Sequence, residues 1–176
     1  MFRHTFHSYS AMSHFLIAHN MFPQARFLLN FVVSRKGKGS ASSVWALVLE
    51  TKGTHQCNFV FDSLMIAYID LGFFFFSDAI QCFGLVRNHK LRVPFRGCQY
   101  LLDRMMKISS LIVSLGFYME ILEYGFPPNM YSFNILMNKL CREDLIKDVQ
   151  IVFDEIERRG LNASIVSFNT FFQQIL

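Results

Sequence analysis

The sequence has little proline, little glycine and little charge. Only four prolines and nine glycines occur among its 176 residues, whereas 21 residues are phenylalanine. Because a loop-rich scaffold needs more proline and glycine, long regular elements are expected here. Charged residues make up 17% of the chain and hydrophobic residues 52%, which is too apolar for intrinsic disorder. The chain is therefore expected to fold, and helix is the first expectation.

Cysteine is also scarce, and its placement argues against a metal site or a disulfide framework. The four cysteines stand far apart in the sequence, and the six histidines match no zinc-ligand spacing. The sequence shows no nucleophile with a nearby base and no glycine loop of phosphate-binding type. We therefore expect no metal, no cofactor and no enzymatic activity, with thiols that pack as small apolar groups.

Long uninterrupted apolar runs are missing as well. The longest apolar stretch, from Leu64 to Val86, is interrupted by Asp70 and Asp78, so a membrane-spanning helix is not expected. A targeting leader is not expected either, because the repeat pattern begins at about Phe6.

The excess of 17 Lys and Arg over 13 Asp and Glu gives a net charge of +4, which suits a polyanionic partner.

What the sequence does contain is an internal repeat. Tyr131-Ser-Phe-Asn134 recurs as Val166-Ser-Phe-Asn169, a displacement of 35 positions. Within the unit that starts at Met130, apolar residues follow the i, i+3, i+4, i+7 spacing of an amphipathic helix twice, 16 positions apart. Each unit is therefore expected to be a hairpin of two helices.

This register divides the whole chain into units. It predicts an all-α fold, a right-handed α-solenoid of antiparallel helix hairpins with a period of about 35 residues. Two extra residues are expected in the turn around Phe73–Phe76, with at least one phenylalanine ring exposed. The predicted organisation is a divergent first repeat at 1–40, an insertion or linker with room for a short helix at 41–57, repeats at 58–94, 95–129 and 130–164, and a truncated fifth repeat at 165–176.

These residues resemble the pentatricopeptide repeat family, in its P-type form. The unit from Met130 matches best, through Tyr131-Ser-Phe-Asn134, and the turn Gly125-Phe-Pro-Pro-Asn129 is similar to the closing turn of the family. The tetratricopeptide repeat, a related hairpin, is disfavoured because it needs a small residue where Met65 and Met137 stand.

The resemblance implies that single-stranded RNA is bound with one base per repeat. Asn134 with Ser164 is the usual combination and implies a pyrimidine, with cytidine favoured. The base-reading candidates that the resemblance implies are Asn134, Ser164, Asn169, Gln99, Asn129 and Asp62. The residues it places beside the bases are Phe59, Arg96, Tyr131 and Val166, for which first-turn packing between hairpins is the alternative.

Three functions stay open at this point. The first is single-stranded RNA binding with a role in organellar RNA processing, the second is a protein-interacting solenoid, and the third is a truncated fragment with little activity. Stacking contributes roughly 1–3 kcal/mol per base, so two or three bases would give a dissociation constant on the order of 100 μM or weaker. The resemblance implies a mitochondrial location, with chloroplast or cytoplasm as alternatives.

Overall fold

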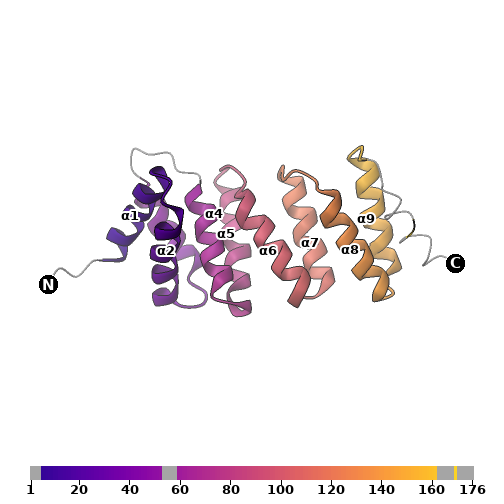
Figure 1. The fold of residues 1–176 in the computed structure, drawn as a ribbon, viewed down its shortest axis with the longest axis horizontal. Helices are drawn as coiled ribbons and strands as arrows, with labels where there is room; N and C mark the ends of the chain where they lie inside the picture. Colours follow the sequence, from indigo (N-terminus) through magenta and orange to yellow (C-terminus); the bar gives the residue numbers. More distant parts are fainter. Residues whose placement is uncertain (1–4, 53–58, 162–168, 170–176) are drawn as a thin grey trace. The chain divides into compact units, whose positions relative to one another are not determined.

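The computed structural model describes residues 5–52, 59–161 and 169, and in these residues the regular secondary structure is helical, without strands (Figure 1). The expected all-α class is confirmed. The helices are α1 (Phe6–Ala18), α2 (Phe22–Lys36), α3 (Ala41–Glu50), α4 (Phe59–Asp70), the short 3₁₀ helix η1 (Phe73–Phe75), α5 (Phe76–Asn88), α6 (Phe95–Ile108), α7 (Leu111–Glu123), α8 (Met130–Arg142) and α9 (Ile146–Arg158).

Short turns with left-handed residues reverse the chain between helices. Asn20, Lys90 and Asp144 have φ angles of 61°, 52° and 56°, and each lies in the first residues after a helix. Gly125 and Gly160 do the same after α7 and α9, with φ angles of 99° and 64°. A residue with positive φ ends a helix sharply and satisfies its last carbonyl groups, so the next helix begins within a few residues.

The chain divides into two compact units, Met1–Arg104 and Met105–Leu176. In the first unit, α2 packs along α1 and α4, α4 packs along α5, and α3 packs along α5. In the second unit, α8 packs along α9 and also contacts α7. The consecutive helices α4 and α5, and likewise α8 and α9, lie side by side and run in opposite directions, as the hairpin prediction requires (Figure 1).

The predicted insertion or linker at residues 41–57 contains the short helix for which the sequence has room, and its place in the repeat register stays a prediction. Residues 41–50 form α3, whose buried side chains repeat the spacing found in α5. Ala41 also follows the buried Ala25 by the same 16 positions that separate the two helices of the repeat at 130–164. Because α2 packs along α4 and α3 along α5, the contacts favour α2 and α3, rather than α1 and α2, as the equivalent of the next hairpin.

The four consecutive phenylalanines behave as expected. Residues Phe73–Phe75 form η1, a 3₁₀ turn directly before α5, which absorbs the two extra residues. Phe73 is 55% exposed and Phe74 72%, whereas Phe76 is buried. The prediction of at least one largely exposed ring is therefore confirmed.

Two buried aspartates hold helix starts in the first unit. The Asp78 carboxylate accepts hydrogen bonds from the backbone N–H groups of Gly39 and Ala41, both at 3.2 Å, at the start of α3. The Asp62 carboxylate accepts one from Gly97 N–H at 2.8 Å, in the first turn of α6. A carboxylate suits this place because the first N–H groups of a helix lack intrahelical partners and carry partial positive charge.

The remaining polar and apolar features of the described residues add few functional candidates. No described helix is long and apolar enough to cross a membrane. Nor do His, Cys, Asp and Glu side chains gather anywhere in the described ranges as a group of three or more that could hold a metal ion. Cys82, Cys98 and Cys141 are buried free thiols, and burial raises the pKa of each.

Candidate nucleic-acid interface

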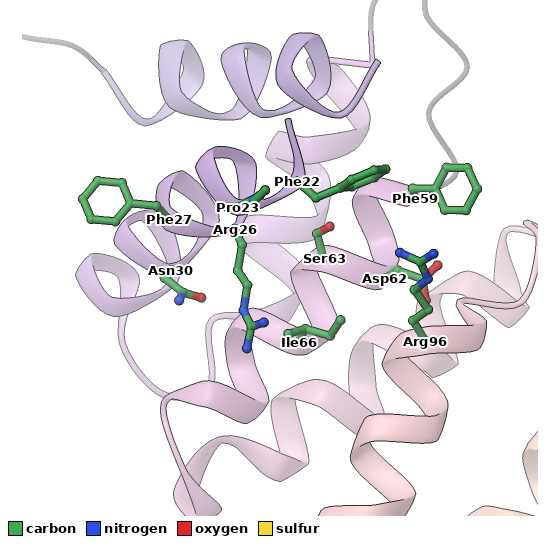
Figure 2. Close-up of a pocket in the computed structure, with 10 residues that line it drawn as sticks. All are labelled: Phe22, Pro23, Arg26, Phe27, Asn30, Phe59, Asp62, Ser63, Ile66 and Arg96. Carbon is green, nitrogen blue, oxygen red and sulfur yellow. The ribbon is translucent and has the colours of Figure 1, made fainter. Parts of the chain in front are cut away.

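An open cavity of about 450 Å³ lies in the first unit where α2, α4 and the start of α6 meet (Figure 2). Its volume falls in the range of small-molecule sites. Figure 2 shows side chains of all three helices around the opening. The lining residues are Phe22, Pro23, Arg26, Phe27, Asn30, Phe59, Asp62, Ser63, Ile66 and Arg96.

Aromatic rings and a guanidinium group line one side of this cavity. The rings of Phe22 and Phe59 meet edge to face, with centroids 6.4 Å apart. The Arg96 guanidinium lies 5.9 Å from the Phe22 ring centroid. Phe59 is 45% exposed and Phe27 71%, so planar apolar surface is open to a ligand. Such a surface can stack on any nucleobase, whatever the sequence of the RNA.

Two polar residues of the cavity, Asp62 and Arg26, are engaged within the protein. Asp62 is only 6% exposed, its carboxylate is bonded to Gly97 N–H, and burial raises its pKa. The Arg26 guanidinium makes a two-pronged ion pair with the Asp70 carboxylate, at 2.7 and 2.6 Å. Asn30 Oδ1, by contrast, is buried and has no hydrogen-bond partner among the described residues. The cavity therefore offers stacking surface, while two of its polar groups are already engaged.

Phe22 and Arg26 are not among the predicted site residues, because the repeat register assigns the apolar residues from Ala25 to Val32 to the second helix of the first hairpin. In the structure, Arg26 follows the buried Ala25 as Asp62 follows the buried Phe61. If α2 and α4 are paired in this way, the arginine and the aspartate stand at the same position of the two helices. The 16-position offset from Ala25 to Ala41 was the signal in the sequence that could have revealed this.

Two further base-reading candidates have intramolecular partners. The Gln99 side-chain amide donates to Asp103 Oδ1 at 2.9 Å along α6. The Asn129 side-chain oxygen accepts from Tyr131 N–H at 2.9 Å and so caps the start of α8. Gln99 and Asn129 belong to different units. The roles predicted for them in base reading stay predictions.

The second unit holds the best-matching repeat. Asn134 lies half-buried on α8, and Tyr131, one turn earlier, is 67% exposed. Asn169 is helical and exposed. Ser164 and Val166 lie outside the described residues, so the expected placement of Asn134 beside Ser164 also stays a prediction.

Positive charge is concentrated in the unit that holds the cavity. Residues 1–104 contain 11 Lys and Arg against five Asp and Glu, a net charge of +6. Residues 105–176 contain six against eight, a net charge of −2. The overall +4 therefore conceals a basic first unit, which favours a polyanionic ligand at its cavity.

Helix pairs with a recurrent pattern of buried residues define a helical-repeat protein. The structure is similar to the crystal structure of the pentatricopeptide repeat protein PPR10 from maize, with a TM-score of 0.55 and 15% sequence identity. The match includes 85% of this chain and 20% of the maize chain. At this identity the likeness shows the fold.

Curated relatives carry the same family description. A pentatricopeptide repeat-containing protein of Arabidopsis thaliana is 55% identical over 94% of this chain, and a second is 28% identical over 78%. The chain spans 27% of the length of the first relative and 18% of the second. No family model matches the chain. The chain belongs to the pentatricopeptide repeat family, as its residues indicated.

Proposed function

We propose that this chain binds single-stranded RNA, with bases stacked in the cavity of Phe22 and Phe59. The observation that supports this most directly is the exposed aromatic surface between α2 and α4, in a unit with a net charge of +6. Stacking surface together with positive charge is the usual combination for single-strand binding. Arg26 and Asp62, the two charged groups on α2 and α4 there, already have partners, so stacking is expected to contribute more than base identity at this cavity.

The second part of the proposal concerns base selection by the second unit. Asn134 has both a donor and an acceptor on a short side chain, and it stands beside the exposed face that carries Tyr131. We place base discrimination, with a pyrimidine preferred, at Asn134 and Ser164. No catalytic step is included, because members of this family are generally non-enzymatic RNA-binding proteins. A mitochondrial site of action is part of the proposal, since plant members are generally organellar.

A binding titration of the full chain tests the proposal. Fluorescence anisotropy with labelled single-stranded homopolymers and a matched duplex should show weak binding to single strands, with a dissociation constant on the order of 100 μM. Phe59→Ala should weaken binding by the equivalent of about 1–3 kcal/mol for one stacked base. Asn134→Ala should flatten the preference among homopolymers. Failure of the parent chain to bind any single strand at millimolar concentration would remove the proposal.

Protein interaction is the second candidate function. It is favoured by Phe73 and Phe74, whose exposed rings stand next to each other at the turn before α5, with centroids 6.2 Å apart. Exposed apolar patches of this kind often mark contact surfaces. An Asn134→Ala variant that keeps the base preference of the parent chain would favour this function over RNA readout.

A further inference from the structure

A run of cationic side chains leads to the edge of the aromatic cavity. Between the end of α5 and the first turn of α6 the chain contains four arginine or lysine residues and one histidine, all exposed, and no acidic residue. They are Arg87, His89, Lys90, Arg92 and Arg96. The run lies in the basic first unit, and Arg96 at its end is part of the cavity lining.

Arg92 and Arg96 converge on a second, smaller hollow. This hollow has a volume of about 70 Å³ and is lined by both arginines together with Phe59, Asp62, Val93 and Phe95. It adjoins the larger cavity, because Phe59, Asp62 and Arg96 line both. The larger space has room for a nucleobase, whereas the smaller one has room for a group of only a few atoms.

Charge at the small hollow favours an anion. Asp62 is its only acidic lining residue, and that carboxylate is buried and bonded to Gly97 N–H. Two exposed guanidinium groups therefore face a single aspartate whose charge is already directed at a helix start. Guanidinium groups bind phosphate oxygens in two-pronged fashion, and arginine is the side chain best suited to do so.

We propose that Arg92 and Arg96 bind the phosphodiester group of the nucleotide whose base occupies the cavity of Phe22 and Phe59. The inference rests on the proposed RNA function. It assigns Arg96 a different task from the base-flanking one implied by the family resemblance. The contact of its guanidinium with the Phe22 ring holds Arg96 at the boundary between the two hollows, where base and phosphate would meet.

The salt dependence of RNA binding separates this role from stacking. Each phosphate that is no longer neutralised should reduce the slope of log K against log salt concentration by about 0.7 for a single strand. For the full chain and a labelled single-stranded RNA, the Arg92→Ala, Arg96→Ala double variant should lower the slope by about 0.7, because both guanidinium groups contact the single charge of one phosphodiester, and Arg92→Ala alone should lower it by part of this amount. Preference among bases should stay as in the parent. Lys147→Ala, which removes an exposed lysine of α9, serves as the control and should leave the slope unchanged.

Several outcomes would overturn the inference. Unchanged slopes in both arginine variants, with RNA still bound, would show that these side chains do not contact phosphate, while the RNA function stands. Absence of binding by the parent would remove both proposals together. Inorganic phosphate, added at constant ionic strength, should displace little RNA. If it displaces RNA from the parent but not from the Arg92→Ala variant, the hollow is a site for free phosphate instead. Thermal melting of each variant checks that the fold is retained.

Discussion

The backbone N–H of Gly97 donates a hydrogen bond to the Asp62 carboxylate over 2.8 Å, and this contact joins α4 to the first turn of α6. Asp62 is buried at this place, and desolvation raises its pKa although Arg96 and Arg92 are near. The interaction therefore combines a favourable helix-start contact with the cost of a buried charge. Substitutions of Asp62 can therefore measure the helix-start contact and the cost of the buried charge separately.

Asp62→Asn and Asp62→Ala should separate the two effects. Asparagine keeps an acceptor for Gly97 N–H and removes the charge, so the free energy of unfolding at pH 7 should be unchanged or higher. Alanine leaves the N–H without its partner and should cost about 1–3 kcal/mol. Urea unfolding followed by circular dichroism measures both.

The pH dependence gives an independent check on Asp62. Because its pKa is raised in the folded state, the folded chain binds this proton more tightly than the unfolded chain. The contribution of Asp62 to stability should therefore fall as pH rises from the ordinary aspartate pKa through the raised folded one. The Asp62→Asn variant lacks this decline, so parent and variant curves that run parallel from pH 4 to pH 7 would contradict the assignment.

Gly97 permits the close approach of α4 and α6. A Cβ atom at this position would lie 2.9 Å from Met65 Cβ and 3.3 Å from the Asp62 carbonyl oxygen. Gly97→Ala should therefore reduce the free energy of unfolding by about 1–3 kcal/mol through overpacking. Gly116→Ala in α7 is the matched control, since nothing lies within 4 Å of its Cβ, and it should add about 0.5–1 kcal/mol. Equal effects of the two substitutions on the melting temperature would refute the close-approach argument.

His14 should make the packing of α1 sensitive to acid. Its Nε2 lies 2.9 Å from the Val48 carbonyl oxygen, so Nε2–H donates, and Nδ1 is buried without a hydrogen-bond partner in the described part of the chain. Burial lowers the pKa of His14 below its ordinary value of 6.5. The stabilising contribution is present above pH 6.5 and is lost as pH falls through the lowered pKa, because the unfolded chain then binds the proton more readily. His14→Gln, which keeps a donor, should flatten thermal stability between pH 7 and pH 5, and a drop as steep as in the parent would exclude His14 as its source.

The exposed rings of the turn before α5 should promote association. Replacing Phe73 and Phe74 by serine removes apolar surface that is 55% and 72% exposed, so self-association at high concentration should decrease while stability changes little. Sedimentation velocity measures the first quantity and thermal melting the second. Phe76→Ser, at a buried position of the same turn, should instead destabilise the fold. A double variant that associates as strongly as the parent would show that this patch is not a contact surface.

The sequence alone determined the class of fold and most of the helices. Apolar spacing predicted the helices from Phe59 to Arg158, because an amphipathic period is a local property that each helix carries in its own residues. The same reasoning placed the four phenylalanines at a turn with exposed rings, since two residues beyond the period have to be accommodated at a helix end.

The tertiary structure decided which helices pack along one another and which candidate residues have intramolecular partners. The spacing of buried residues fits α1 with α2 and also α2 with α3, so only the packing of α2 along α4 and of α3 along α5 distinguishes the two pairings. In the same way, Asp62 and Asn129 have residue types suited to reading bases, yet their oxygens accept hydrogen bonds from helix starts. The convergence of Arg92 on Phe59, far away in sequence, depends on how α4 and α6 approach each other. Helix period is encoded within about a dozen residues, whereas these relationships arise from packing between segments distant in sequence, which a local pattern does not specify.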